Sequence, residues 1–237
     1  MTPVLSVRGL AWARPEAAGG FALEIPSLRV APGEIVALAG ESGSGKTTAL
    51  DLLGLLRLPD LVAEFRLAGE DVAARLSGGL DAVAGLRRER IGHVLQQGGL
   101  LPFLTVAENI ALTARPGRAP PFALGELAER LGLAGVLDRS PEAVSIGQRQ
   151  RVAIARAVMG DPALILADEP TAALDPPTAR EVLSLLLELA RARGAGVVMA
   201  SHSWGLIAEF ALPVLRAEVT ATPAGPRAVF RPAEVAA

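Results

Sequence analysis

The chain has 237 residues, 51% of them hydrophobic, and carries 23 basic against 25 acidic side chains for a formal net charge of −2. This near-neutral balance gives no electrostatic footprint for binding nucleic acid, and the lack of cysteine excludes disulfides and thiolate metal sites. With no signal peptide pattern and no apolar run long enough to span a membrane, the sequence predicts a soluble chain, in which Lys46 is the only lysine.

The first clear element is a strand predicted at Ile35–Ala39, which is apolar on both faces and is followed directly by the sequence GESGSGKTT. This segment fits the pattern G-x-x-x-x-G-K-[ST] in its required place between a strand and a helix. Its glycines let backbone N–H groups surround a phosphate, Lys46 reaches the outer phosphates, and Thr47 offers a hydroxyl to Mg²⁺. The candidate phosphate-binding residues are Gly40, Glu41, Ser42, Gly43, Ser44, Gly45, Lys46, Thr47 and Thr48.

A second strand is predicted at 91–95, after which the strand signal stops until about residue 163. Between about 98 and 150 the sequence predicts a helical insert, with amphipathic stretches at 105–113 and 124–131 separated by a proline-rich loop. The segment at 76–80, which precedes this strand, is predicted to be a loop.

A strand predicted at 163–167 ends in two adjacent carboxylates, Asp168 and Glu169, within the sequence ALILADEPT. Asp168 can hold Mg²⁺, directly or through water, and Glu169 is placed to polarise an attacking water. Two consecutive carboxylates could also simply cap the following helix. The phosphate-binding loop elsewhere in the chain favours the catalytic interpretation.

The last part of the chain continues the alternation of helices and strands. A helix is predicted at about 177–193, where valine and leucine recur at helical spacing, and a buried strand at 197–200. The segments 214–219 and 228–230 are predicted to be closing strands. This alternation predicts an α/β fold with a mostly parallel sheet and with ligand sites at the carboxyl ends of its strands.

A long continuous segment connects these elements to a known family. Residues 144–175, VSIGQRQRVAIARAVMGDPALILADEPTAALD, resemble without gaps the part of an ATP-binding cassette (ABC) ATPase that runs from its signature motif, LSGGQ, to its D-loop. The resemblance covers nearly the whole chain and implies a single cassette over 1–237. It implies a P-loop NTPase core with a mainly parallel sheet flanked by helices, an N-terminal antiparallel β part, and a helical subdomain at about 98–150. The segment 86–110 looks closest to the lipoprotein-release and macrolide-export subgroup.

The resemblance also implies roles for residues that follow strands. Gln96 stands where the family places its Q-loop glutamine, near the metal, with Gln97 as the alternative. His202 stands where the family places the switch histidine that contacts the γ-phosphate, and Asp175 matches the D-loop aspartate. The implied catalytic residues are Glu169, His202 and Gln96, the implied metal-binding residues are Thr47, Gln96 and Asp168, and the implied cofactors are ATP and Mg²⁺.

In this family the signature motif closes over the nucleotide of a second cassette, so the resemblance implies a homodimer or heterodimer with two ATPs in its interface. Ser145, Gly147 and Gln148 would contact the opposite nucleotide. The chain departs from the motif at its first glycine, which is Ile146 here. An isoleucine is expected to disfavour a positive φ at this position and to add bulk near the phosphate, which would weaken closure.

The family stacks adenine on an aromatic side chain shortly before the P-loop, but this chain has no tyrosine, and the aligned position is Arg14. An arginine can lie flat against a base through its planar guanidinium. Alternation along 10–14 puts Trp12 on the same face, so Arg14 and Trp12 are both candidates for the adenine contact. For Trp12 the alternative interpretation is simple core packing.

A cassette without membrane spans resembles the ATPase subunit of an ABC transporter. The resemblance therefore implies ATP hydrolysis coupled to separate transmembrane permease subunits, from a cytoplasmic position that is peripheral on the inner face of the cell membrane. No nucleic acid partner is expected. Two alternatives remain open: a soluble ABC ATPase that acts on ribosomes or DNA, and a degenerate cassette that binds ATP but hydrolyses it little.

Overall fold

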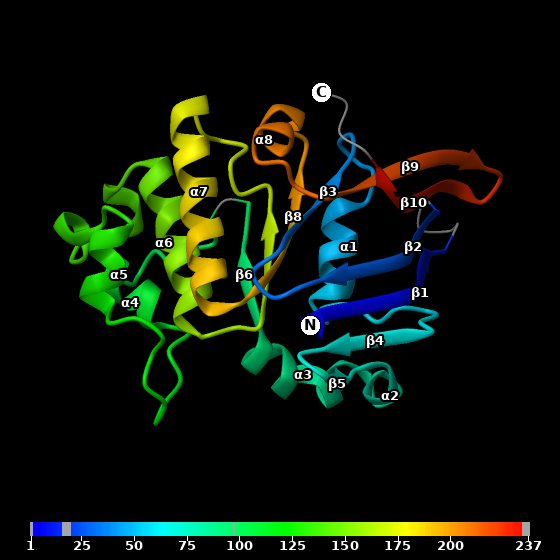
Figure 1. Ribbon diagram of the computed structural model, residues 1–237, viewed down its shortest axis with the longest axis horizontal. Helices are drawn as coiled ribbons and strands as arrows, with labels where there is room; N and C mark the ends of the chain where they lie inside the picture. The colour runs from blue at the N-terminus through cyan, green and yellow to red at the C-terminus, as the bar shows by residue number, and fades with distance from the viewer. Residues whose placement is uncertain (1, 16–19, 97, 234–237) are drawn as a thin grey trace.

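The computed structural model describes residues 2–15, 20–96 and 98–233, and within these ranges ten strands form one mixed sheet (Figure 1). The strands are β1 (Leu5–Arg14), β2 (Phe21–Val30), β3 (Ile35–Ala39), β4 (Glu64–Leu67), β5 (Glu70–Asp71), β6 (Ile91–Val94), β7 (Leu164–Asp168), β8 (Gly196–Ser201), β9 (Val214–Thr222) and β10 (Gly225–Ala233). The helices are α1 (Lys46–Leu53), α2 (Ala73–Leu76), α3 (Gly79–Arg90), α4 (Val106–Ala111), α5 (Leu124–Arg130), α6 (Ile146–Met159), α7 (Pro176–Arg193) and α8 (Trp204–Glu209), with short 3-10 helices at Ala134–Val136 and Pro141–Ala143.

The sheet has an antiparallel half and a parallel half, in the strand order β5-β4-β1-β2-β10-β9-β3-β8-β7-β6. Strands β5, β4, β1 and β2 pair antiparallel with one another, whereas β3, β8, β7 and β6 pair in parallel. The antiparallel hairpin β9–β10 joins the two halves, since β10 pairs in parallel with β2 and β9 in parallel with β3. The predicted α/β fold with an N-terminal antiparallel part is confirmed.

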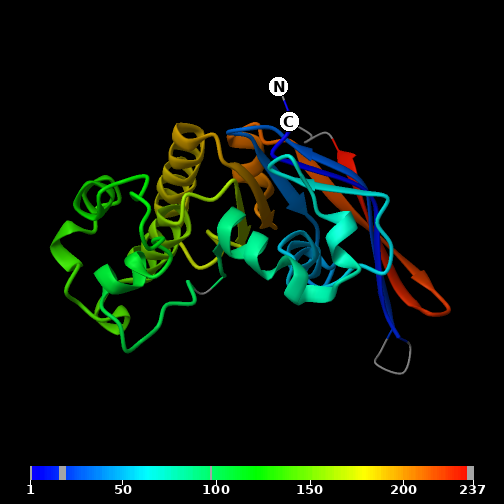
Figure 2. The same ribbon diagram turned by 90° about the horizontal axis from the view of Figure 1, so that it is seen from below.

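Strand β3 is buried on both faces, because the side chains on its two faces pack in two different hydrophobic cores. Ile35, Ala37 and Ala39 pack in one core with α7 and the helices between β6 and β7. Val36 and Leu38 pack in the other with α1 and the N-terminal strands. Helices α1 and α7 accordingly lie on opposite faces of the sheet (Figure 2). This double burial explains why the strand is a continuous apolar run in the sequence.

Helix α7 begins and ends at residues suited to those positions. The Asp175 carboxylate caps its start by accepting a hydrogen bond from the backbone N–H of Thr178 at 3.1 Å, and Pro176 is the first helical residue. The hydrogen bonds from Thr178 lower the pKa of the Asp175 carboxyl. Gly194 ends the helix with φ 64°, a left-handed conformation that favours glycine. The helix predicted at 177–193 is confirmed.

The helices between β6 and β7 lie together beside the parallel half, at the end of the molecule away from the β9–β10 hairpin (Figure 1). Helix α4 begins with a capping box in which the backbone N–H of Glu108 donates to Oγ1 of Thr105, and the Glu108 carboxylate accepts from the Thr105 N–H. The stretches predicted to be helical at 105–113 and 124–131 are confirmed as α4 and α5. Across the described ranges, every helix is too short or too polar to cross a membrane.

The predicted loop at 76–80 is wrong. Leu76 is the last residue of α2 and Gly79 the first of α3, which leaves a short turn between two helices. Helix α3 buries only Val83 and Leu86, so its apolar stripe is too narrow to give a clear helical period. The strands predicted at 214–219 and 228–230 are confirmed and extend further as β9 and β10.

Candidate functional site

The loop that connects β3 to α1 requires glycine at particular positions. Gly43 and Gly45 have φ of 79° and 90°, a region that L side chains rarely adopt. A Cβ at Gly45 would also lie 2.8 Å from Cζ of Phe21, because β2 packs directly against the loop. The loop therefore turns at the carboxyl end of β3 and leads into the N-terminus of α1, whose N–H groups and dipole favour an anion.

Lys46 is the first residue of α1, and its side chain is only 7% exposed. Its Nζ donates to the carbonyl oxygens of Gly40 at 2.8 Å and Glu41 at 3.0 Å, and lies 3.7 Å from Oε1 of Glu169. The ammonium is thus held between the loop and a carboxylate. From this position it can place a compact positive charge on phosphate oxygens bound by the loop.

Thr47 and Asp168 meet between α1 and the end of β7. The Thr47 hydroxyl donates to Oδ2 of Asp168 at 2.9 Å. Oδ1 of Asp168 is buried and has no hydrogen-bond partner among the described residues. Since buried polar atoms normally have partners, this oxygen beside a hydroxyl fits Mg²⁺, which takes oxygen ligands from one or two carboxylates and keeps several waters.

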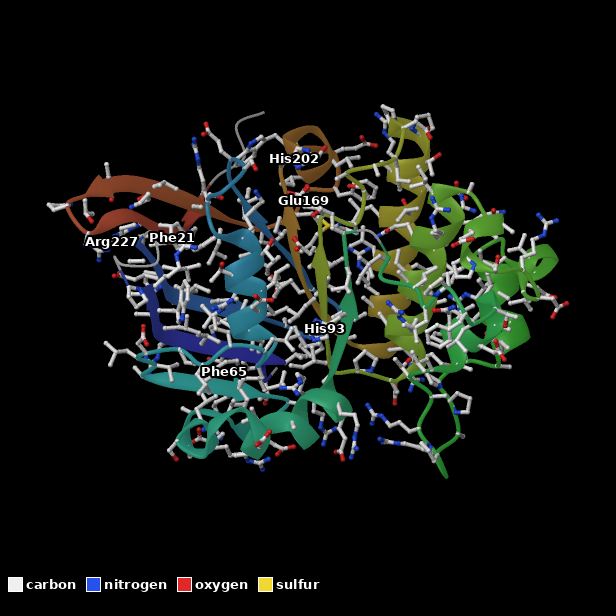
Figure 3. All side chains as sticks on the ribbon, turned by 180° about the vertical axis from the view of Figure 1, so that it is seen from behind. Phe21, Phe65, His93, Glu169, His202 and Arg227 are labelled. Atoms are coloured by element: carbon white, nitrogen blue, oxygen red, sulfur yellow. The ribbon has the colours of Figure 1, made fainter. Side chains whose placement is uncertain are left out.

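Glu169 and His202 lie close together at the carboxyl ends of β7 and β8 (Figure 3). Nδ1 of His202 is 2.5 Å from Oε2 of Glu169. Glu169 has φ 49°, a strained conformation for a residue other than glycine and one that concentrates at functional sites. Its backbone N–H donates to the carbonyl of Ala200 at 3.0 Å, so the next strand fixes this conformation. Glu169 is therefore held in place through both its backbone and its side chain.

Lys46, Thr47, Glu169 and His202 line one cavity of about 630 Å³, whereas Asp168 is outside its lining. The described residues that line it are Arg14, Phe21, Glu41, Ser42, Gly43, Gly45, Lys46, Thr47, Thr48, Gln96, Glu169 and His202. Gly40 and Ser44 belong to the same loop but are buried and outside the lining, and a Cβ at Gly40 would be 2.6 Å from Oγ of Ser44. Gln96 faces the cavity, while its alternative, Gln97, lies outside the described residues. The structure thus brings together segments that are far apart in the sequence.

The two candidates for the adenine contact separate in the structure. Arg14 lines the cavity, whereas Trp12 is outside its lining and packs against the core of the antiparallel half. The guanidinium of Arg57 covers the Trp12 ring at 4.6 Å from its centroid. The ring of Trp12 is already used in packing, which favours the interpretation of Trp12 as a core residue.

Phe21 is a cavity residue that the sequence reasoning missed. It lies directly opposite Arg14 in the antiparallel pairing of β1 with β2, and its ring contacts the phosphate loop at Gly45. Its place in the cavity follows from the register of β1 with β2, which the apolar pattern of a single strand does not show.

The signature residues lie at the start of α6 and line a different cavity, of about 450 Å³. Ser145 and Gln148 form a capping box, in which the N–H of Gln148 donates to Oγ of Ser145 at 3.2 Å and the N–H of Ser145 donates to Oε1 of Gln148 at 2.9 Å. A Cβ at Gly147 would lie 3.1 Å from Cγ2 of Thr178, so glycine allows α6 to approach α7 closely. This cavity shares no lining residue with the first.

Ile146 is the first residue of α6 and does not have a positive φ. The expected conflict with a positive φ is therefore wrong, because the residue already lies in the helix and an isoleucine fits its backbone. Its side chain is 51% exposed and lines the signature cavity. Compared with the glycine of the LSGGQ motif, isoleucine at this position therefore adds bulk to the surface without straining the backbone.

Comparisons with known proteins point to one family and fold. The chain matches the ABC transporter family over residues 23–172. It is 40% identical over 212 residues to the lipoprotein-releasing system ATP-binding protein LolD of Hyphomonas neptunium, covering 87% of this chain and 91% of LolD. It is also 40% identical over 208 residues to the macrolide export ATP-binding/permease protein MacB of Sodalis glossinidius, but that match spans 85% of this chain and only 31% of MacB. A solved dimeric structure of the ATP-binding cassette MJ0796, in a post-hydrolysis state bound to ADP and Pi, is similar with a TM-score of 0.74 at 31% identity, covering 90% of this chain and 93% of that one.

Proposed function

This chain belongs to the ABC transporter family of ATP-binding cassettes, and we propose that it binds and hydrolyses ATP to drive a transporter whose membrane-spanning permease subunits are separate chains. The observation that carries the proposal is one cavity that the phosphate loop shares with the Glu169–His202 pair, next to the Thr47–Asp168 pair. Transfer of a γ-phosphate to water needs donors for its oxygens, a metal site and a positioned water. The cavity offers a candidate for each.

The phosphate end of the cavity supplies the donors and the metal site. The loop amides and Lys46 bind phosphate oxygens, and the N-terminus of α1 adds its positive end. Thr47, Gln96 and Asp168 would hold Mg²⁺, which when bound neutralises negative charge on the phosphates. Oδ1 of Asp168 is buried and has no hydrogen-bond partner in the part of the chain that the structure describes, which supports this assignment.

Glu169 is the proposed general base. Oε2 of Glu169 lies 2.5 Å from Nδ1 of His202, and Oε1 lies 3.7 Å from Nζ of Lys46, so the carboxylate is oriented toward the phosphate loop. In this position it can accept a proton from a water that attacks the γ-phosphate. The side chain of His202 is 61% exposed, which leaves it free to contact the γ-phosphate. Arg14 and Phe21 offer flat surfaces to adenine elsewhere in the same cavity.

The signature residues are proposed to act on a second cassette. Ser145, Gly147 and Gln148 line a cavity separate from the phosphate loop of their own chain, so a nucleotide that they contact belongs to another copy or to a related cassette. The dimeric form of the MJ0796 cassette supports this arrangement. Exposed Ile146 favours a second candidate, a degenerate cassette that closes weakly and hydrolyses little ATP.

The relatives support a permease partner. MacB is named as both an ATP-binding protein and a permease, and this chain spans 31% of it. LolD is named as an ATP-binding protein alone, and this chain spans 91% of it. We therefore propose that the chain works like LolD, as an ATPase subunit that docks on separate permease subunits at the cytoplasmic face of the cell membrane.

The variant Glu169→Gln tests the proposed hydrolysis. It removes the general base and leaves the phosphate loop intact, so ATP with Mg²⁺ is expected to hold two chains together as a dimer, measured by size exclusion with light scattering. The same variant with ADP should remain monomeric. The matched control Glu129→Gln, at an exposed glutamate of α5, should not accumulate a dimer. A Glu169→Gln variant that stays monomeric with ATP and Mg²⁺ would contradict the proposal.

A further inference from the structure

Helix α8 begins shortly after His202, but its own sequence does little to stabilise it. The helix has six residues, and Ser203 at its N-cap makes no side-chain hydrogen bond to the first turn. Gly205 lies in that first turn and lowers its helix propensity. A helix this short and without a side-chain cap is marginal by itself. Its position, and with it the position of His202, therefore depends on contacts with the rest of the molecule.

A second cavity, of about 430 Å³, lies beside the Glu169–His202 pair. Its lining includes Pro176 at the start of α7 and Leu206 on α8. Because this space is not filled by side chains, close packing alone does not fix the separation of α8 from the start of α7. The charged lining residues Glu169 and Glu209 outnumber the single guanidinium of Arg180, which disfavours an anionic ligand here.

Contacts of several kinds hold α8 in place. Ile207 is fully buried in the core, and the guanidinium of Arg216 lies 5.7 Å from the centroid of the Trp204 ring. Nε of Arg180 donates to both carboxylate oxygens of Glu209, each at 2.8 Å. The last contact joins α8 to α7 among the residues that line the second cavity.

The ion pair also connects two functional segments. Arg180 lies near the start of α7, the helix that Asp175 caps, and Glu209 is the last residue of α8, which follows His202. Both side chains are about half exposed, and such pairs contribute little to the free energy of unfolding. The Arg180–Glu209 pair is therefore expected to affect the position of α8 and to add little to the stability of the whole fold.

We propose that Arg180 and Glu209 are positioning residues for hydrolysis. Their ion pair holds α8 against α7, so that Nδ1 of His202 stays next to the carboxylate of Glu169. The inference rests on the proposed ATPase function, since it assigns the pair a role in that reaction. Neither side chain lines the nucleotide cavity. The pair therefore affects kcat rather than the binding of ATP.

Charge reversal tests the pair. Arg180→Glu and Glu209→Arg each replace attraction by repulsion, and each is expected to lower kcat about threefold to fivefold while KM for ATP stays unchanged. The double variant R180E/E209R restores opposite charges at exchanged positions and should recover most of kcat. A double variant that is no better than the worse single variant would overturn the proposal.

The matched control is the ion pair between Arg130 and Glu188, at 2.5 Å, which also joins α7 to another helix, in this case α5. The reversals Arg130→Glu and Glu188→Arg, alone and together, should leave kcat unchanged. An equal loss of kcat in this control set would show that charge reversal on α7 acts generally, and it would overturn a specific role for Arg180 and Glu209.

Trp204 provides a readout that does not depend on hydrolysis. The chain has two tryptophans, so Trp12→Phe leaves Trp204 as the single indole fluorophore. In that background each single reversal should shift the emission of Trp204 to longer wavelength, and the double variant should reverse the shift. If the wild-type chain hydrolyses no ATP, the proposed function fails but this comparison still tests the pair. Emission that is unchanged in both single variants would overturn the proposed positioning of α8.

Discussion

At the scale of single residues, the surroundings of Lys46 explain why it is the only lysine among 23 basic side chains. Its ammonium is within hydrogen-bond distance of two carbonyl oxygens and near one carboxylate, and the side chain is almost entirely buried. A guanidinium is broader and carries five donors in a rigid plane. It could not take this place without displacing the loop that surrounds the phosphates.

The substitution Lys46→Arg is therefore expected to weaken the binding of ATP about tenfold or more, although it conserves the charge. Isothermal titration calorimetry with ATP in the presence of EDTA measures this directly, without hydrolysis. Arg88→Lys, the opposite exchange at an exposed position on α3, should bind ATP like the wild type. Equal affinity of Lys46→Arg and the wild type would show that the loop accepts either cation.

At the scale of elements, the start of α6 distinguishes two reasons why Ile146 could weaken the signature motif: a disfavoured positive φ and added bulk. Ile146 already has a helical backbone, so a need for positive φ does not disfavour it. Its exposed side chain lines the signature cavity and adds bulk where a second cassette would approach. Only this bulk remains as a reason for weak closure.

Ile146→Gly and Ile146→Ala should therefore raise the ATPase rate by similar amounts, about threefold, because both remove the bulk. The rate is measured over a range of protein concentrations, since easier dimer closure acts most strongly at low concentration. Glycine also reduces helix propensity relative to alanine, so a pair of variants is more informative than one. A rise with glycine alone would restore the conformational explanation, and no rise with either would mean that Ile146 does not limit closure.

At the scale of the whole molecule, the predictions succeeded where the signal is contiguous in the sequence. The buried strands at Ile35–Ala39 and 197–200 each carry their own apolar pattern, and the residues that follow them meet because the strands are parallel neighbours. Most of the phosphate end of the site was predictable for this reason. The apolar pattern did not reveal helix α3, because this helix buries only two residues.

Features that depend on how strands pair could not be predicted in the same way. Phe21 enters the cavity through its register with Arg14, and no local pattern records a register. The same is true of β10, which lies between β2 and β9 although the sequence places β2 and β10 near opposite ends of the described chain. For Trp12, the alternation of residues along 10–14 predicted a position on a strand, which is β1. It could not predict that the side chain of Arg57, from a different segment, would cover the Trp12 ring.

A permease partner can be tested on the whole molecule. A tagged chain purified from detergent-solubilised membranes of its source cells should recover a protein with several membrane spans. That complex should hydrolyse ATP, and its Glu169→Gln form should not. Ribosomes or DNA in place of a membrane protein would instead support the alternative of a soluble cassette.

The position of β10 also has a consequence for the order in which this chain folds. Arg227 on β10 binds Glu24 on β2, and the two residues are 203 positions apart in the chain. During synthesis β2 leaves the ribosome long before β10 exists, so the two halves of the sheet cannot yet be joined through this strand. Their union is a late step between remote segments, which is a slow kind of contact to form. Until then, the edge of β2 that β10 will cover is open to pairing with the wrong strand.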